Sequence, residues 1–347
     1  MKIPSLVRPL QVLALAAAAA LTGHAADAPP APYSPEVLPG SGLAQHPFFY
    51  AGEWYYTKPD QTMFVVRDGV VAWSYSIPLK DAKGNIQEFS DGTLLSNGNI
   101  VFARKTGAGE ITPDKTLIWN YDAPPGFEVH VIQPLGLDRV MIIQNGNPAK
   151  MMIIRIATGS VEKEMILPTG NPAKTHGQFR RARLTAAGTL LAAHMDNNKV
   201  AEYDMTGKEI WSIAIPSPWA AVRLKNGNTL VTSNRGFVRE VNPKGETVWE
   251  LTQKDVPDIR LFSLQEADRL ANGDTVISNW CPNGVVDAKG AKDPSRWPTT
   301  VQVLEVTPEK KVVWALRSWT PPADLGPATC IQLLDEPGVP ENGEQQR

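Results

Sequence analysis

The chain has 347 residues, of which 42% are hydrophobic and 20% charged, proportions that are ordinary for a globular protein with a sizeable core. Its 34 basic and 36 acidic residues give a net charge of −2 and are spread along the chain without a long run of one sign. This balance excludes a nucleic-acid partner and a charged patch for membrane surfaces.

The first 25 residues are typical of a secretory signal peptide. Two basic residues precede an apolar run over residues 11–21, and cleavage fits after Ala25 or Ala28. The run is shorter than the ~20 residues that span a bilayer. His24 stands where a lipoprotein would need its anchoring cysteine. We therefore expect a periplasmic or secreted monomer without a membrane span.

The remaining chain divides into three parts. Residues 26–47 are rich in proline and lack a helical or strand period, which predicts an extended linker. Residues 48–338 form the expected single domain, and residues 339–347 the expected disordered tail.

A repeated hairpin organises the domain. An apolar strand follows a turn in LLSNGNIVFA from Leu94, PLGLDRVMII from Pro134, RLTAAGTLLA from Arg183, RLKNGNTLVT from Arg223 and RLANGDTVIS from Arg269. A later strand in each unit carries a marker residue, usually tryptophan: Trp73, Trp119, Met165, Trp211, Trp249 and Trp314. Alternating apolar residues between turn signals indicate strands. The markers are mostly 46 or 38 residues apart, with a last interval of 65 that contains an insertion, and such self-similarity indicates a repeat architecture.

Six such units predict an all-β fold, a six-bladed β-propeller with four-stranded blades, because a radial arrangement protects the sheet edges. The Asn226-Gly227 pair is typical of a two-residue hairpin turn. Before Trp73 the chain supplies only three strand-like segments, beginning with GEWYY from Gly52. The segment ATCIQLLD from Ala328 is expected to add the innermost strand and close the first blade.

The segment YDMTGKEIW at residues 203–211 looks like the tryptophan-docking repeat of PQQ-type propellers. With the NGNTL hairpins, the chain resembles the bacterial PQQ-like and arylsulfotransferase-like propeller families over residues 46–335. The resemblance implies the fold and the packing of blades. PQQ-dependent dehydrogenases usually have eight blades and adjacent cysteines, so we expect no bound quinone and assign no cofactor.

Hairpin register predicts a site at the blade ends opposite the turns. A turn at Asn226-Gly227 pairs Trp219 with Asn234, and the same rule pairs Phe179 with His194 and three further pairs. Those ends gather at one face of the channel. The candidate catalytic residues there are His130, His176, His194 and Arg180. The candidate ligand-binding residues are Glu88, Arg104, Trp219, Arg235, Gln265, Glu266 and Trp280.

These residue types suit an anionic ligand. Histidine exchanges protons near neutral pH, and arginine binds a carboxylate, sulfate or phosphate through two parallel hydrogen bonds. Each histidine or tryptophan could instead be structural. We assign no metal ligands, because no tight ligand spacing occurs, although histidines with Glu88 or Glu266 remain an alternative.

Two features near this face stay open. Cys281 and Cys330 lie in neighbouring blades and form either a disulfide or two buried thiols. The insertion from Cys281 to Thr300 either overhangs the channel through Arg296 and Trp297 or is an ordinary surface loop.

Two function classes fit this pattern. The first is a propeller that binds a small anionic molecule, a carbohydrate or a periplasmic protein at the face opposite the turns. The alternative is a lyase or group transferase that acts there on an anionic carbohydrate or aryl ester through histidine and arginine.

Overall fold

The inner hairpins close through a three-residue loop rather than the expected two-residue turn. In the fifth blade, the NH of Leu224 donates to the carbonyl of Asn228 at 2.8 Å, and the NH of Gly227 donates to Leu224 at 3.0 Å. Gly227 alone in this loop has a left-handed backbone, with φ of 88°. The two-residue turn predicted at Asn226-Gly227 is therefore wrong, and the register of the hairpin shifts by one residue.

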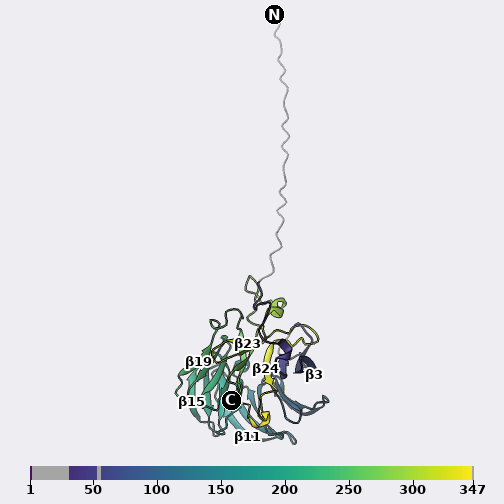
Figure 1. Cartoon of the computed structure of the whole chain (residues 1–347). Coiled ribbons are helices and arrows are strands. Elements are labelled where there is room, and N and C mark those ends of the chain that lie inside the picture. The colour runs from purple at the N-terminus through teal and green to yellow at the C-terminus, as the bar shows by residue number, and fades with distance from the viewer. Residues whose placement is uncertain (2–30, 53–55, 346–347) are drawn as a thin grey trace. The chain divides into compact units, whose positions relative to one another are not determined.

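Six four-stranded antiparallel sheets form the domain in the computed structural model, which describes Met1 and residues 31–52 and 56–345 (Figure 1). The predicted all-β, six-bladed propeller is confirmed. The strands of the first three blades are β24 (Ala328–Leu333), β1 (Phe48–Gly52), β2 (Asp60–Arg67) and β3 (Val70–Pro78); β4 (Phe89–Leu94), β5 (Ile100–Arg104), β6 (Gly107–Ile111) and β7 (Leu117–Asp122); and β8 (Glu128–Leu135), β9 (Arg139–Asn145), β10 (Ala149–Arg155) and β11 (Ser160–Leu167).

The other three blades follow the same plan, with the innermost strand first in sequence. Their strands are β12 (Phe179–Leu184), β13 (Leu190–His194), β14 (Lys199–Tyr203) and β15 (Glu209–Ala214); β16 (Pro218–Arg223), β17 (Thr229–Ser233), β18 (Phe237–Val241) and β19 (Thr247–Leu251); and β20 (Ser263–Arg269), β21 (Thr275–Trp280), β22 (Val303–Val306) and β23 (Val312–Leu316). Short 3-10 helices interrupt the loops: η1 (Gly42–Ala44), η2 (Thr175–Gly177), η3 (Pro294–Thr299) and η4 (Pro340–Asn342).

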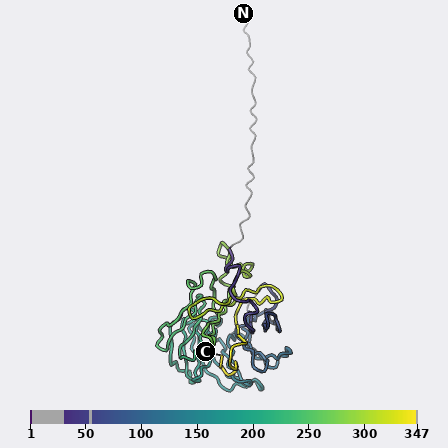
Figure 2. The backbone as a smooth tube through the Cα atoms, in the orientation of Figure 1, coloured from purple at the N-terminus to yellow at the C-terminus, as the bar shows by residue number. Residues whose placement is uncertain are grey.

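The C-terminal strand closes the ring, as predicted. β24 pairs with β1 in antiparallel register, so that Tyr50 lies opposite Ile331. Figure 2 shows this late segment, in yellow, beside the purple start of the domain. The first strand, β1, begins at Phe48, earlier than the GEWYY segment that the sequence suggested.

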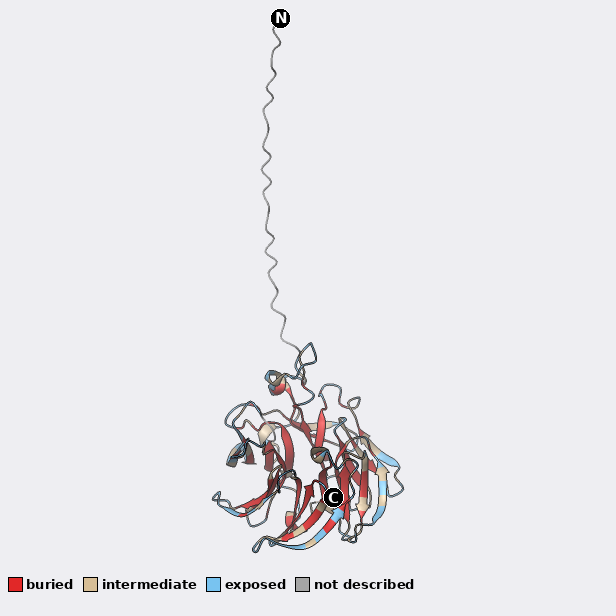
Figure 3. Ribbon diagram, turned by 180° about the vertical axis from the view of Figure 1, so that it is seen from behind, coloured by how far each residue is buried: buried red, intermediate tan, exposed pale blue. Residues whose placement is uncertain are grey.

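Six apolar clusters join neighbouring blades. The cluster between the first and sixth blades includes Phe48 and Trp314, and the one between the third and fourth includes Ile143 and Tyr203. Inner strands are mostly buried, with half-buried residues at the turn ends of strands such as β4 and β16, whereas outer strands such as β15 contain exposed residues (Figure 3). The burial of both faces of each sheet against its neighbours stabilises the ring.

Tryptophans of the outer strands connect the blades. Trp211 and Trp249 donate from Nε1 to the carbonyls of Pro243 and Pro308 in the turns of the following blades, at 3.0 and 2.8 Å. This arrangement agrees with the docking role that the repeat implies.

Segments outside the strands also pack on the propeller. In the predicted linker, His46 lies between the carboxylates of Glu305 and Asp335, at 3.0 and 2.8 Å. Residues 339–345, where we expected disorder, contain η4, and the buried Glu341 accepts hydrogen bonds from Ser96. The predicted signal peptide lies outside the described residues except for Met1. No helix in the described part of the chain is long and apolar enough to cross a membrane.

Candidate functional site

A β-bulge interrupts every innermost strand at the end opposite its turn. In β4, Phe89 pairs with Arg104 and Asp91 with Ala103, so Ser90 is the extra residue. The equivalent extra residues are His130, Arg180 with Arg181, Trp219, Gln265 and Thr329. Bulges bend a strand and re-aim its side chains. Of the register pairs predicted from the turn, the structure retains only Phe179 with His194. We call the face at this bulged end the upper face.

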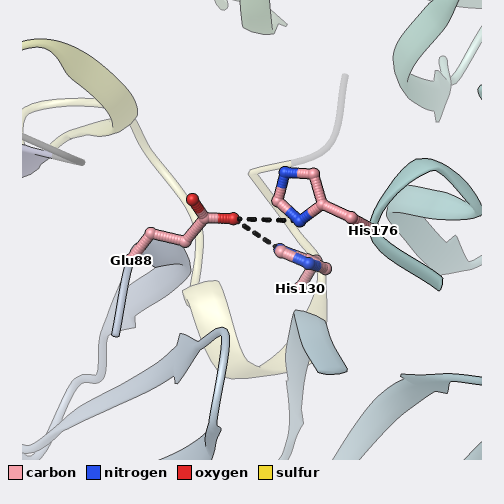
Figure 4. Close-up of side chains that lie close together, drawn as sticks. All are labelled: Glu88, His130 and His176. Atoms are coloured by element: carbon pink, nitrogen blue, oxygen red, sulfur yellow. Dashed lines mark ion pairs between the residues drawn. The ribbon is translucent and has the colours of Figure 1, made fainter. Parts of the chain in front are cut away.

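Glu88, His130 and His176 converge on the upper face (Figure 4). They come from three segments: the residue before β4, the strand β8 and the helix η2. The Oε1 atom of Glu88 lies 3.5 Å from Nδ1 of His176 and 3.7 Å from Nδ1 of His130. This Oε1 is buried and has no hydrogen-bond partner within the described residues.

His130 is fully buried and its tautomer follows from its neighbours. Arg180 can only donate a hydrogen bond, and its Nη1 lies 3.1 Å from Nδ1 of His130. Nδ1 is therefore the acceptor, and Nε2–H donates to Oε2 of Glu128 at 2.9 Å. Burial, followed by the positive charge of Arg180, lowers the pKa of His130 to about 4. His130 is neutral at neutral pH.

His176 is the accessible member of this cluster, since 45% of its side chain is exposed. Its Nδ1 donates to Oε2 of Glu128 at 2.8 Å. Lys105 reaches Oε1 of the same carboxylate at 3.3 Å. Burial raises the pKa of Glu128, but the hydrogen bonds from His130 and His176 outweigh burial and hold that pKa below its ordinary value.

Two tryptophans continue the upper face beyond Arg180. The guanidinium carbon of Arg180 lies 4.7 Å from the centre of the Trp219 ring, and Trp219 stacks on Trp280 with centroids 6.5 Å apart. Both tryptophans are buried. The buried, stacked tryptophans thus stabilise the position of the Arg180 guanidinium through a cation–π contact.

A groove of about 290 Å³ opens to solvent between the fifth and sixth blades. Its lining residues are Asn234, Arg235, Arg260, Leu261, Phe262, Ser263, Asn283 and Gly284. The side chains of Arg235 and Arg260 are exposed, and neither guanidinium pairs with a carboxylate among residues 31–52 and 56–345. A Cβ at Gly284 would lie 2.3 Å from the ring of Phe262, so only glycine permits this close approach.

The insertion after β21 builds one wall of this groove with Asn283 and Gly284. It is anchored rather than extended over the channel. Trp297 is buried in a small apolar cluster with Trp319, and Arg296 lies over the ring of Tyr33 at 4.1 Å.

Four predicted site residues lie elsewhere. His194 is buried, and its Nε2 bonds to the hydroxyl of Tyr203 at 2.8 Å. Burial, followed by the charge of Lys199, lowers the pKa of His194 to about 3, so it packs as a neutral ring. Arg104 pairs with Asp122 at 2.9 Å on the second blade. Gln265 is buried and accepts a hydrogen bond from the hydroxyl of Thr329, and Glu266 belongs to the ion network described next.

Below the upper cluster, a buried ion network fills the channel. Arg181 of the fourth blade contacts Asp91 of the second blade at 2.8 Å and Glu266 of the sixth at 2.5 Å. It also donates to the carbonyl of Thr329 in the first blade at 2.8 Å, and Arg183 adds a second contact to Asp91. Arg180 and Arg181 thus diverge, as the sequence predicted, Arg180 to the upper cluster and Arg181 to the channel. The thiols of Cys281 and Cys330 are free and buried, one of the two arrangements that the sequence left open.

Sequence reasoning missed Glu128, Arg260, Asp91 and Arg183. Glu128 begins β8, two residues before His130. The turn and the bulge together shift the register there by two residues, so that Asn145 pairs with Glu128 and not with His130. Arg260 lies in the loop before β20, where no hairpin partner fixes its position. Arg183 and Asp91 are ordinary strand positions without a motif.

The family described as outer membrane protein assembly factor BamB matches residues 169–288 of this chain. A search of curated proteins gave no significant match. A protein of unknown function from Bacteroides caccae is similar in structure, with 23% identity and a TM-score of 0.69 over 84% of this chain and 98% of its own.

Two further solved structures are similar over most of their length. A streptogramin B lyase is 14% identical, with a TM-score of 0.50 over 81% of this chain and 85% of its own. The β-propeller domain of Cps50 (Swd1) from Myceliophteria thermophila is 14% identical, with a TM-score of 0.50 over 82% and 90%. At these identities the likeness shows the fold alone. The matches described above include no arylsulfotransferase, so that part of the resemblance stays an expectation.

Proposed function

We propose that this chain, a β-propeller of the PQQ-like family, binds a small ligand that carries an anionic group, in the groove of the upper face. The observation that carries the proposal is the pair Arg235 and Arg260. Both guanidinium groups line one groove, and neither is neutralised by a carboxylate within the described residues. Elsewhere on the propeller, arginines such as Arg155 and Arg239 pair with acidic side chains.

The groove suits a carboxylated sugar. Guanidinium groups bind carboxylate or sulfate through two parallel hydrogen bonds. The amides of Asn234 and Asn283 and the hydroxyl of Ser263 provide further donors and acceptors for sugar hydroxyls. The ring of Phe262 adds an apolar surface. Concave sites with a few convergent polar groups are typical of small-molecule binding.

A thermal-shift screen against uronic-acid oligosaccharides and sulfate esters tests this proposal, because a ligand that binds the native state raises the melting temperature. The double variant R235Q/R260Q should lose the shift, whereas R155Q, which removes a surface arginine that is paired with Glu162, should retain it. Equal shifts in R235Q/R260Q and wild type would place the ligand elsewhere. A propeller that binds only a partner protein through this face would show no shift with any of these small anions.

An enzymatic role is the second candidate, and the accessible His176 favours it. His176 bonds to Glu128, a partner that orients the ring for proton transfer. The ring of His130 lies beside it, and Arg180 contacts His130. The neutral His130 would position groups rather than supply protons. If a uronate or sulfate ester is turned over, H176A should abolish turnover without changing the melting temperature, while H194Q should leave the rate unchanged.

The cellular location belongs to the same proposal. We infer export to the periplasm from the predicted signal peptide, and the similarity of residues 169–288 to BamB supports this location. Cell fractionation with determination of the mature N-terminus tests the inference. Recovery of the intact chain, with Met1, from the cytoplasm would contradict it.

A further inference from the structure

We propose that Glu88, His130 and His176 form a binding site for a divalent transition metal, best suited to Zn²⁺, on the upper face. This site is separate from the anion groove and goes beyond the proposed function. One oxygen of Glu88 and one nitrogen of each histidine lie within 4.8 Å of one another, and Figure 4 shows the three side chains pointing to a common centre.

The spacing of the ligand atoms approaches that of a zinc site. Zn²⁺ binds imidazole nitrogen at about 2.0–2.1 Å and carboxylate oxygen at about 2.0–2.2 Å in tetrahedral geometry, which places ligand atoms about 3.3–3.5 Å apart. Oε1 of Glu88 lies 3.5 Å from His176 and 3.7 Å from His130. Two histidines with one carboxylate and an open position are the ligand set of many catalytic zinc sites.

Two of the three ligand atoms, from Glu88 and His130, are also in the chemical state that a metal requires. Oε1 of Glu88 receives no hydrogen bond from the described residues, and the side chain of Glu88 is only 3% exposed. The contact of this Oε1 with Nη1 of Arg180, at 3.5 Å, is an ion pair without a hydrogen bond, so a cation bound more closely would compensate better for the burial of this oxygen. Nδ1 of His130 is unprotonated, because Nε2–H is held by Glu128, and its lone pair now accepts from Ser90 at 2.9 Å and from Arg180 at 3.1 Å. A carboxylate that fixes the second nitrogen of a ligating histidine is the usual outer partner of a metal site.

Arg180 now lies where the metal would bind. Its Nη1 is 3.1 Å from Nδ1 of His130 and 3.5 Å from Oε1 of Glu88. A guanidinium and a metal ion cannot share this position, so they compete. The ring of Trp219 provides a surface on which Arg180 can stay when it is displaced. The half-exposed His176 has to give up the hydrogen bond from its Nδ1–H to Glu128, by rotation or by transfer of the proton to Nε2, before it can offer a lone pair to the metal.

Titration of the purified, chelator-treated protein with Co²⁺, followed by displacement with Zn²⁺, tests the proposal. We expect one equivalent of Co²⁺ with visible d–d absorption. H176A and E88Q should each weaken binding at least tenfold, and R180M should strengthen it. Because His176 is exposed, H176A remains informative if E88Q does not fold. H46Q is the control for a second histidine beside two carboxylates, and it should bind as wild type does.

Three outcomes would overturn the proposal. The first is the absence of Co²⁺ binding to the wild type at micromolar metal. The second is equal affinity in H176A, E88Q and wild type. The third is loss of the bound equivalent in H46Q alone, which would place the metal on the opposite side of the ring. If R180M binds Co²⁺ with the same affinity as wild type, Arg180 does not compete with the metal for this position. Failure of the anion screen leaves these results unaffected, because Arg235 and Arg260 take no part in them.

Discussion

Replacement of Arg181 by methionine should be the most damaging single change in the channel. Methionine keeps the apolar stem but removes a cation whose side chain is only 3% exposed. Glu266 would lose its only ion-pair partner within the described residues, and the carbonyls of Ser90 and Thr329 would lose their donor. Breaking a buried pair from one side costs about 3–5 kcal/mol, because the remaining charge stays buried.

A melting experiment measures this cost. Domains of 150–250 residues lose about 2–4 °C per kcal/mol, so the midpoint of R181M should fall by about 6–20 °C. R155M is the matched control. Arg155 contacts Asp138 and Glu162 on the surface with 42% of its side chain exposed, and its loss should cost about 0–1 kcal/mol.

The double variant R181M/E266Q distinguishes the cost of the unpaired charge on Glu266 from the cost of the altered side-chain shape. Neutralising Glu266 removes the stranded charge, so this variant should recover part of the lost stability. If R181M and R155M have the same melting temperature, the buried network does not stabilise the blades across the channel.

Three further predictions concern the ring. W249F should lower the free energy of unfolding by about 1 kcal/mol in urea, because Trp249 loses its hydrogen bond to Pro308; an unchanged unfolding midpoint would contradict this. Removal of residues 328–347 should abolish cooperative unfolding, because β24 closes the first blade, whereas removal of residues 346–347 should not. Burial lowers the pKa of His46, but hydrogen bonds and charges of Glu305 and Asp335 outweigh it and raise that pKa to about 9. The stabilisation is complete below the unfolded pKa of about 6.5 and is lost as pH rises through about 9, so H46Q should differ from wild type more at about pH 6 than at about pH 10 in thermal melts.

Sequence patterns predicted the ring more fully than the site. The repeated hairpins and marker tryptophans gave the blade number, and the missing strand before Trp73 indicated closure by Ala328–Leu333. Both depend on patterns that recur six times. The bulged residues share no chemistry, since Ser90, His130 and Trp219 occupy equivalent positions. The local sequence therefore contains no pattern that predicts the shift in register at the bulges.

The consequence differs among the candidate residues. Residues near the bulges stayed on the upper face despite the error, as Glu88 and His130 show. His194 pairs as predicted, yet its ring packs against Tyr203 inside the blade. The direction of a side chain in a twisted, bulged hairpin does not follow from the pairing rules of regular strands. Arg260 lies in a loop, where pairing rules do not apply.

A crystal structure of the protein with a bound uronate tests the account most directly. We expect the carboxylate within hydrogen-bond distance of both Arg235 and Arg260, with the sugar beside Phe262. A fully occupied uronate bound anywhere else on the propeller, while this groove holds only solvent, would contradict it.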